Sequence, residues 1–319
     1  MVVDARQGRV PDFFVVGHAK CGTTALYRML SAHPQIYMPE LKEPHFFARE
    51  SYHRPPSAKR RPETLEAYLA LFEAAGPGQR AGEASTSYLP SPSAAGRIAA
   101  LRPDARIIAI FREPAAFLRS LHLQLLQSGI ETESDFARAV GLELERRRGK
   151  SVTDESFWAS MLLYTDQVRY VEQLRRYHEH FGRERVLALI YDDYRLGNER
   201  VARQVLRFLG VDDSIELERF EANPTVRVRS RRGQELVRAV SVGRSPAARA
   251  VKTALKTIAP KRLRDEALQM VDRKVVDREP RPPDERFMVE LRRRFKGEVI
   301  AASEYLERDL VSLWGYDRL

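Results

Sequence analysis

The sequence predicts an α/β fold of three layers, in which helices flank a mostly parallel central sheet. The first observation is a buried-strand pattern at 13–16, which passes through a loop with two glycines into a helix. The second is an apolar strand at 106–111 that runs directly into a helix at 115–127. The third is another apolar strand, at 185–191, with a helix at 196–209 after it. Strands that alternate with helices are typical of parallel sheets, because parallel neighbours need a long crossover connection.

The remaining elements are expected from apolar spacing and from helix breakers. Leu26, Met29 and Leu30 repeat at helical spacing. This first helix is expected to end at His33-Pro34, where the proline disfavours further helix. The other segments are a short apolar piece at 35–38 and helices at 63–74, 93–101, 160–180 and 284–306.

Charge separates two segments from this regular pattern. Residues 131–150 are charged and end in consecutive arginines, so we expect a solvated or mobile insertion there. Residues 244–281 are basic, and amphipathic helices in this segment would present one side to a membrane surface or to a polyanion. We expect one domain over residues 1–319, with a core at about 11–215 and a basic helical part at about 216–319.

The composition limits the classes of protein to which this chain can belong. Apolar residues make up 43% of the chain, enough for a core, and the formal charge of +10 implies anionic partners. Cys21 is the only cysteine, so no intramolecular disulfide can form and a cytoplasmic location is expected. No apolar run approaches the ~18 residues that span a bilayer, so no transmembrane segment is expected. No nucleic-acid partner is expected either.

The stretch between Gly17 and Gly22 predicts a phosphate-binding loop. Backbone N–H groups of such a loop and of the next helix point at one spot, where the helix dipole also favours an anion. Thr23 and Thr24 add hydroxyl donors. A nucleotide-hydrolysing loop reads G-x-x-x-x-G-K-[ST], but here Thr23 stands where that lysine belongs, and Lys20 lies inside the loop. The hydroxyls can then bind phosphate oxygens without holding Mg²⁺.

The run from Lys20 to Tyr27 resembles the 5′-phosphosulfate loop of sulfotransferases that use 3′-phosphoadenosine 5′-phosphosulfate (PAPS). The branch it most resembles contains bacterial enzymes and Golgi enzymes that act on glycosaminoglycans. The resemblance implies a P-loop-like fold and a set of loop residues that bind PAPS, namely Lys20, Cys21, Gly22, Thr23, Thr24 and Ala25. For Cys21 itself we expect a small residue that fits the loop rather than a nucleophile.

The same resemblance implies a reaction. A sulfuryl group would pass from PAPS to a hydroxyl or amine of a small-molecule or carbohydrate acceptor, such as a glycolipid or a secondary metabolite. Adenosine 3′,5′-bisphosphate would be the product, and no metal is required because sulfuryl carries less charge than phosphoryl. Lys20 would neutralise charge on the bridging oxygen as the phosphate leaves.

Two candidate bases lie in the loop Lys42-Glu43-Pro44-His45-Phe46-Phe47. Polar side chains followed by two aromatics suggest an anchored loop that holds a carboxylate and an imidazole in place. The family has a Lys-Glu-x-His-Phe-Phe pattern here, and Glu43 matches the glutamate that deprotonates the acceptor. His45 is the second candidate for the base. The alternative is a surface carboxylate at Glu43, with His45 packed on Phe46.

One further element departs from the family pattern. The run from Gly82 to Leu89 resembles Gly-Glu-Lys-Ser-Pro-x-Tyr, but Ala84 replaces the lysine that is usual there. In relatives this lysine lies near the sulfonate or the acceptor. The resemblance therefore implies no second active-site lysine at this position.

One further segment resembles the family's 3′-phosphate element. It contains a strand, an arginine, a proline and a helix with a serine eight residues beyond the arginine. Arg112 offers a guanidinium whose fork suits phosphate, and Ser120 offers a hydroxyl. Arg229 and Ser230 lie in a run with four arginines in six residues. This run is expected either to close over the nucleotide or to form a solvated face.

Two other classes of function stay open on the sequence. A nucleotide-dependent small-molecule kinase would need Mg²⁺ and an acidic residue at a strand end, for which Asp192 and Asp193 are the candidates. A non-enzymatic polyanion-binding protein would need a basic face without a competent cleft. Specificity for an acceptor is expected in the irregular segments 48–62 and 131–160.

Overall fold

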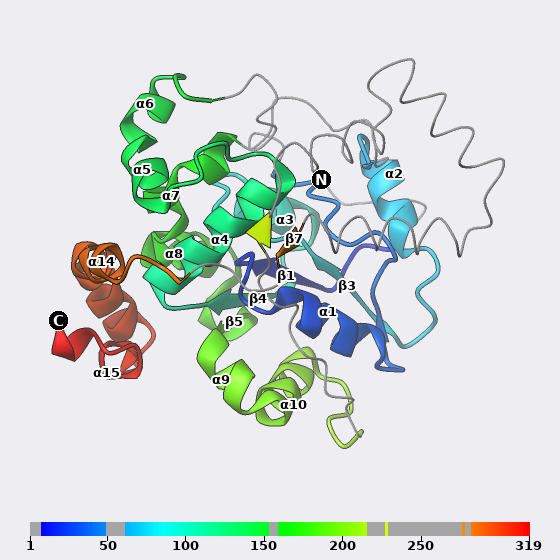
Figure 1. Ribbon diagram of the computed structural model, residues 1–319. Coiled ribbons are helices and arrows are strands. Elements are labelled where there is room, and N and C mark those ends of the chain that lie inside the picture. The colour runs from blue at the N-terminus through cyan, green and yellow to red at the C-terminus, as the bar shows by residue number, and fades with distance from the viewer. Residues whose placement is uncertain (1–7, 49–60, 153–158, 216–226, 229–275, 278–281) are drawn as a thin grey trace, which may run out of the picture.

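The computed structural model describes residues 8–48, 61–152, 159–215, 227–228, 276–277 and 282–319 (Figure 1). Its strands are β1 (Phe13–Gly17), β2 (Ile36–Tyr37), β3 (Arg80–Ala84), β4 (Arg106–Phe111), β5 (Val186–Ile190), β6 (Arg227–Val228) and β7 (Val276–Asp277). Its α-helices are α1 (Thr23–Ser31), α2 (Leu65–Leu69), α3 (Ala94–Leu101), α4 (Pro114–Ser128), α5 (Phe136–Gly141), α6 (Glu143–Arg147), α7 (Tyr164–Gln167), α8 (Tyr170–Phe181), α9 (Tyr191–Leu196), α10 (Asn198–Leu209), α14 (Glu285–Tyr305) and α15 (Leu310–Leu313). Short 3₁₀ helices are η2 (Ala70–Phe72), η3 (Ala159–Leu162), η4 (Arg183–Arg185) and η5 (Tyr316–Arg318).

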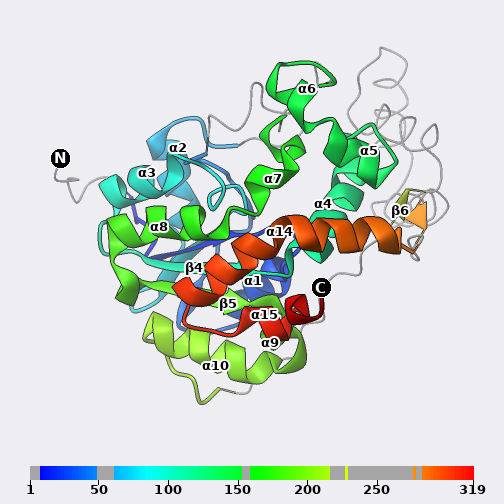
Figure 2. The ribbon, with the colours of Figure 1, turned by 90° about the vertical axis from the view of Figure 1, so that its left-hand side faces the viewer.

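The central sheet has five strands in the order β2-β3-β1-β4-β5, and every neighbouring pair is parallel. Helices α3 and α8 cover one face, and α1 and α10 cover the other (Figures 1 and 2). The predicted α/β fold with a parallel sheet and flanking helices is therefore confirmed. Among the described residues, β6 and β7 form a separate antiparallel pair.

The middle strand β1 is the centre of the core. Phe13, Phe14, Val15 and Val16 have no exposed surface. Its neighbour β3 carries Gly82 directly against Phe13, where a Cβ would lie 2.0 Å from the ring atom Cζ. This close contact requires a glycine at position 82. β3 is not evident from the sequence because it also lacks the β-branched and aromatic residues that are typical of strands.

The strand order places the loop after β1 at the crevice of the sheet. From β1 the chain passes to β2 and β3 on one side, and it then crosses to β4 on the other side. Ligands of open α/β sheets bind beyond the carboxyl ends of the strands at such a reversal of direction. The segments that begin at this edge are His18–Gly22 after β1, Ser85–Leu89 after β3 and Arg112 after β4.

Several predicted helices differ in their limits from the observed ones. The helix expected at 63–74 is short and continues as η2, and the helix expected at 160–180 is broken into η3, α7 and α8. In the second case Gln173 Nε2 donates to the carbonyl oxygen of Asp166 at 3.0 Å, so a side chain satisfies the backbone at the break. The strands β1, β4 and β5 lie within one residue of the predicted ranges.

The prediction of a solvated or mobile insertion at 131–150 is wrong for the helices α5 and α6. Arg146 and Glu131 have side chains only 2% and 1% exposed, and Arg146 Nη2 lies 2.8 Å from Glu131 Oε1. Tyr164 donates its hydroxyl to the other oxygen of Glu131 at 2.9 Å. Arg146 Nη1 also donates to the carbonyl oxygens of Ala139 and Leu162. A charged run is expected to lie in solvent, but here Arg146, the first of three consecutive arginines, forms an ion pair with Glu131 inside the fold.

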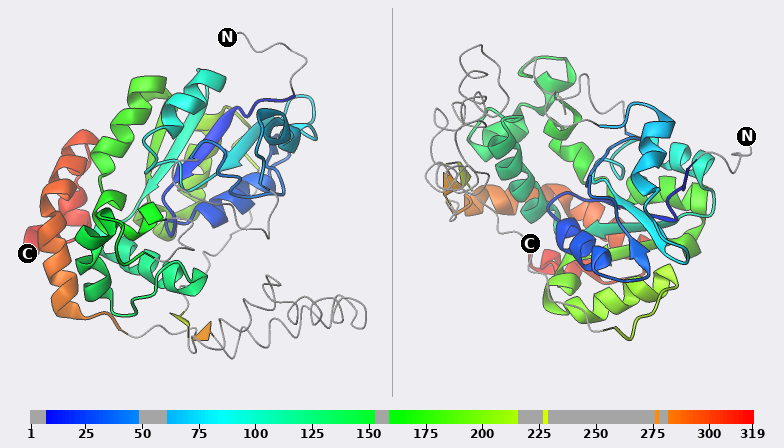
Figure 3. Two further views of the ribbon diagram at one scale, coloured as in Figure 1. Left: turned by 90° about the horizontal axis from the view of Figure 1, so that it is seen from above. Right: turned by 90° about the vertical axis from the view of Figure 1, so that its right-hand side faces the viewer.

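The C-terminal helices pack back onto the sheet domain. Helix α14 lies along the outer side of α4 and α8 (Figures 2 and 3). Beyond it, Trp314 Nε1 donates to Asp192 at 2.9 Å and the Tyr316 hydroxyl donates to Glu113 at 2.5 Å. The segment 308–316 therefore contacts the carboxyl ends of β4 and β5. In the described part of the chain, no helix combines the length and apolar character needed to cross a bilayer.

We predict that Arg146→Leu lowers the free energy of unfolding by about 3–5 kcal/mol, because Glu131 is left charged and buried. Urea unfolding followed by circular dichroism measures this change. Arg148→Leu is the matched control, since Arg148 is exposed, and it should change stability by less than about 0.5 kcal/mol. Equally small effects of both substitutions would contradict the assigned role of Arg146.

Candidate functional site

The loop after β1 presents backbone donors at the N-terminus of α1. Gly22 precedes the helix with φ of 85°, and a Cβ there would lie 3.2 Å from Tyr194 Cδ1, so glycine is required. Because Gly22 has no side chain to cap the first turn, the N–H groups of Thr23, Thr24 and Ala25 are open to an anion. The strand, glycine loop and helix expected from the sequence are all present.

Two cationic side chains meet beside this helix terminus. Arg112 Nη1 donates to the carbonyl oxygen of Lys20 at 3.1 Å. Burial, and then the nearby Arg112 charge, lower the pKa of Lys20 from its ordinary value. No carboxylate among the described residues forms an ion pair with either side chain. This pair of cations is therefore arranged for an anion that the described residues do not supply.

Aromatic residues hold both the guanidinium and the backbone of Arg112 in place. It lies over the Tyr191 ring at 4.7 Å from the centroid, and Tyr170 donates its hydroxyl to the Arg112 carbonyl oxygen at 2.8 Å. The next residue, Glu113, caps α4 by accepting from two backbone N–H groups, and Tyr316 donates to it as well. These contacts fix the backbone on both sides of Arg112.

The other predicted nucleotide-binding residues lie in different surroundings. Ser120 is buried within α4, and its contact with a 3′-phosphate stays a prediction. Cys21 is fully buried, and burial raises the pKa of its thiol to about 12. The thiol is therefore protonated at neutral pH, which agrees with a small structural residue. Arg229 and Ser230 fall outside the described residues.

The candidate bases lie in a loop that two neighbouring elements hold. Glu43 N–H donates to the Ala84 carbonyl oxygen at 3.1 Å, and His45 N–H donates to Ser85 Oγ at 3.0 Å. The Phe46 ring stacks on Tyr68 at 4.5 Å, which anchors the aromatic end of the loop. Ala84 offers no cation to this loop, and the described lysine that pairs with Glu43 is Lys42, whose Nζ lies 2.5 Å from Oε1.

The carboxylate and the imidazole lie in one row with a serine. His45 Nδ1 is 2.7 Å from Ser87 Oγ, and His45 Nε2 is 3.6 Å from Glu43 Oε2. Burial acts to raise the pKa of Glu43, but the contact with His45 and the Lys42 charge outweigh it and lower the pKa to about 2. Burial lowers the pKa of His45. At neutral pH the row therefore contains a charged Glu43 and a neutral His45.

Backbone strain marks the three residues that the sequence predicts to be catalytic. Lys20, Glu43 and His45 have φ values of 61°, 60° and 55°, in the left-handed region. Among the described residues only Ser151 and Glu307 share this conformation without being glycine. Each such residue costs about 1–3 kcal/mol and persists where the surrounding contacts impose it, often at a functional site. The three side chains that the sequence nominates for catalysis are thus all in strained positions.

A buried carboxyl that the sequence did not nominate supports this loop. Glu83 Oε2 accepts from the hydroxyls of Tyr68 and Tyr88 at 2.7 and 3.0 Å. Tyr88 also accepts the N–H of Phe47, so Glu83 is tied to the loop of the candidate bases. Burial raises the pKa of Glu83 to about 7. The signal in the sequence was a glutamate inside a short strand, followed by hydroxyl residues.

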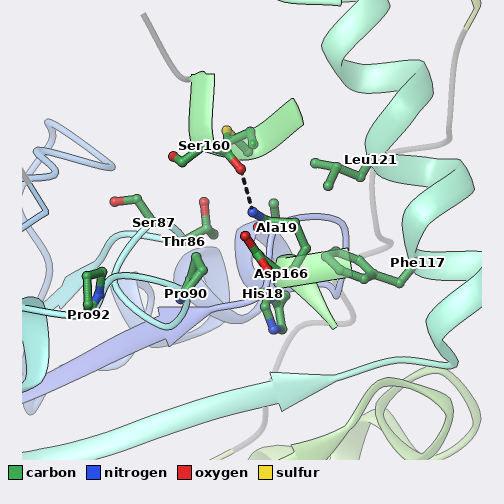
Figure 4. A pocket seen from close by; sticks show the side chains of 12 residues that line it. His18, Ala19, Thr86, Ser87, Pro90, Pro92, Phe117, Leu121, Ser160 and Asp166 are labelled. Carbon is green, nitrogen blue, oxygen red and sulfur yellow. Dashed lines mark hydrogen bonds between the residues drawn. The ribbon is translucent and has the colours of Figure 1, made fainter. Parts of the chain in front are cut away.

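A cavity of about 280 Å³ opens beside these residues (Figure 4). Ala19, which precedes Lys20, and Ser87, which contacts His45, both line it. Thr86 and Ser87 lie across the cavity from Phe117 and Leu121 in Figure 4. The cavity therefore touches both halves of the candidate site, the phosphate loop and the loop of the bases. Phe117 and Leu121 carry no functional signal in the sequence, because they have the spacing of ordinary core positions of α4.

The acidic residues that a Mg²⁺ site would need have other partners. Asp192 accepts from Trp314, and Asp193 forms an ion pair with Arg308 at 2.5 Å. The part of the chain that the structure describes holds no group of three or more His, Cys, Asp or Glu side chains that could bind a metal. Both candidate metal ligands of the kinase alternative thus already have partners within the chain.

A sequence model described as the sulfotransferase family matches residues 11–214. The crystal structure of a sulfotransferase from Alicyclobacillus acidocaldarius is similar over 96% of this chain and 99% of that chain. The TM-score is 0.66 and the sequence identity is 26%. The similarity in structure extends over nearly all of both chains.

Two curated relatives are similar over shorter stretches. Heparan sulfate glucosamine 3-O-sulfotransferase 3A1 of Mus musculus is 27% identical over 225 residues, which is 70% of this chain and 52% of that protein. Carbohydrate sulfotransferase 15 of Homo sapiens is 38% identical over 68 residues, which is 21% of this chain and 12% of that protein. The matches thus span about half or less of these relatives.

We predict that Glu83 makes stability fall as the pH rises. The unfolded chain releases this proton near pH 4.5, whereas the folded protein keeps it until about pH 7. The stabilisation is therefore complete below pH 4.5 and is lost by about pH 7, at most about 3 kcal/mol. Glu83→Gln keeps an acceptor for both tyrosines but cannot titrate.

Urea unfolding of both proteins at pH 5, 6, 7 and 8 tests this. The free energy of unfolding of the native protein, minus that of Glu83→Gln, should fall as the pH rises to about 7 and then become level. A difference that does not change with pH would show that Glu83 is ionised throughout.

Proposed function

Because the chain belongs to the sulfotransferase family, we propose that it transfers a sulfuryl group from PAPS to a hydroxyl or amine of an acceptor. The observation that carries this proposal is the convergence of Lys20 and Arg112 at the N-terminus of α1, with no carboxylate of the described residues to neutralise them. A doubly phosphorylated nucleotide supplies the missing negative charge at two points. The other product is adenosine 3′,5′-bisphosphate.

We assign the phosphate groups to different residues. The N–H groups of Thr23, Thr24 and Ala25 and the Lys20 ammonium would hold the 5′-phosphosulfate. Arg112 would bind the 3′-phosphate, with Ser120 as a second donor, because a guanidinium suits paired phosphate oxygens. PAPS supplies the sulfuryl group, and its bond to the bridging oxygen breaks as the acceptor oxygen binds sulfur.

We assign the acceptor's proton to Glu43. The carboxylate is ionised at neutral pH and lies in the row with His45 and Ser87. A well-placed general base contributes about 10²–10⁴ to the rate. Lys20 would stabilise the charge that develops on the bridging oxygen, an effect of about 3–4 kcal/mol by comparison with oxyanion donors. Lys42 is tied to Glu43 and holds it in place rather than replacing the lysine absent at Ala84.

We predict that adenosine 3′,5′-bisphosphate stabilises the protein without Mg²⁺. At a hundred times the dissociation constant the gain is about 2.7 kcal/mol, whereas AMP and ATP should raise the melting temperature much less because neither fills both phosphate sites. Thermal unfolding with each nucleotide measures this. A shift with ATP and Mg²⁺ as large as with the bisphosphate would support a kinase instead. Comparable shifts with many unrelated polyanions would support a polyanion-binding protein.

Arg112→Ala is the matched variant for this experiment. It should weaken binding of the bisphosphate and leave binding of adenosine 5′-phosphosulfate, which lacks the 3′-phosphate, nearly unchanged. Equal weakening of both would mean that Arg112 acts through its contact with the Lys20 carbonyl oxygen rather than on the nucleotide.

We predict that Glu43→Gln lowers kcat by about two orders of magnitude or more, with bisphosphate binding unchanged. His45→Asn should act mainly on KM, because His45 orients the row through Ser87 and the Ser85 contact. Steady-state kinetics with radiolabelled PAPS separate the two effects. A Glu43→Gln enzyme with near-normal kcat, beside a folded but inactive His45→Asn, would assign the base to His45.

A further inference from the structure

The cavity beside the catalytic loops favours one class of acceptor. We propose that the acceptor is a small uncharged alcohol or phenol with an apolar body, bound in the cavity of about 280 Å³ between Ser87 and Phe117. The inference rests on the proposed sulfuryl transfer and names the substrate of that same site. Its support comes from the position, the size and the charge of the cavity walls.

The position of the cavity fits an acceptor rather than the nucleotide. Ala19 brings the wall next to Lys20, and Ser87 brings it next to His45. With Glu43 ionised, His45 keeps its proton on Nε2 toward that carboxylate, and Nδ1 accepts from the Ser87 hydroxyl. The Ser87 oxygen can then accept a hydrogen bond from an acceptor hydroxyl in the cavity.

This arrangement allows a balanced transfer. The acceptor oxygen forms a bond to sulfur, the bond between sulfur and the bridging phosphate oxygen breaks, and the electron pair of that bond stays on the phosphate. The acceptor O–H bond also breaks and its proton goes to Glu43, while Ser87 and His45 orient the acceptor hydroxyl. No oxidant, reductant or metal is needed for these steps.

The size and the apolar wall limit the body of the acceptor. The cavity is near the lower end of the roughly 300–1,000 Å³ range of small-molecule pockets. Phe117 and Leu121 form an apolar wall, and Pro90 and Pro92 lie on the opposite side (Figure 4). Met161 is a further apolar residue of the lining. One aromatic ring system fits such a wall, whereas a sugar unit would place hydroxyls against carbon.

The charge of the wall argues against an anionic glycan. Among the described residues, no lysine or arginine lines the cavity. Burial lowers the pKa of His18 to about 4 despite its bond with Gln173, so this imidazole is neutral. The one carboxylate, Asp166, is paired with Arg147 at 2.7 Å and Arg169 at 3.3 Å. Carboxylate or sulfate groups of an acceptor would therefore meet no counter-charge among the described residues that line this cavity.

Transfer from radiolabelled PAPS tests the inference with two probes, 2-naphthol and a heparosan hexasaccharide. We expect sulfation of 2-naphthol and none of the hexasaccharide. Met161→Trp narrows the cavity and should raise KM for 2-naphthol about tenfold or more. Ser160→Tyr is a second narrowing variant at an exposed position, in case the first fails to fold. Leu144→Trp is the control, since Leu144 is 62% exposed and does not line the cavity.

Thermal stabilisation by adenosine 3′,5′-bisphosphate is measured on every variant and should be unchanged. Sulfation of the hexasaccharide alone would overturn the inference. So would unaltered 2-naphthol kinetics in both folded narrowing variants, or no transfer to 2-naphthol by a protein that binds the bisphosphate. In these cases the proposed donor site stands. Absence of bisphosphate binding in the native protein would instead refute the proposed function.

Discussion

The repulsion between Lys20 and Arg112 is the constraint on which the rest of the site depends. Two positive charges share one corner of the sheet, and no described carboxylate offsets them. The fold therefore has to hold Arg112 by other means, with the Tyr191 ring below its guanidinium and the Tyr170 hydroxyl on its carbonyl oxygen. Aromatic and backbone contacts can fix a cation without neutralising it, so its charge stays available to a ligand.

The loop of the candidate bases, residues 42–47, has to hold a negative charge rather than two positive ones. The Glu43 carboxylate has to stay ionised and still contact His45, whose other ring nitrogen contacts Ser87 in the cavity wall. Glu83 and its two tyrosines tie down the loop from one side, and Ser85 and Ser87 hold His45 from the other. The strained φ values of Glu43 and His45 are the cost of that position. Both halves meet because β1 and β3 are neighbours in the sheet.

The sequence predicted the elements whose signals are local. The strand, glycine loop and helix around Lys20 were evident from apolar spacing and glycines, and so was the strand that ends at Arg112. Contacts between distant residues left no local signal. Arg146 was expected in solvent because nothing in the charged run itself shows that Glu131 and Arg146 meet inside the fold. Glu83 was missed because a buried carboxyl is recognisable only from the tyrosines that surround it.

The hydrogen bond from Tyr316 to Glu113 joins residues separated by 203 positions. During synthesis on the ribosome, the phosphate loop, the loop of the bases and all five sheet strands emerge long before Trp314 and Tyr316. Until those two residues appear, Asp192 and Glu113 lack their aromatic partners, and the carboxyl edge of β4 and β5 is only partly braced. The nascent chain can therefore assemble its sheet early, but the carboxyl ends of β4 and β5 gain their last two contacts only when the segment 308–316 docks.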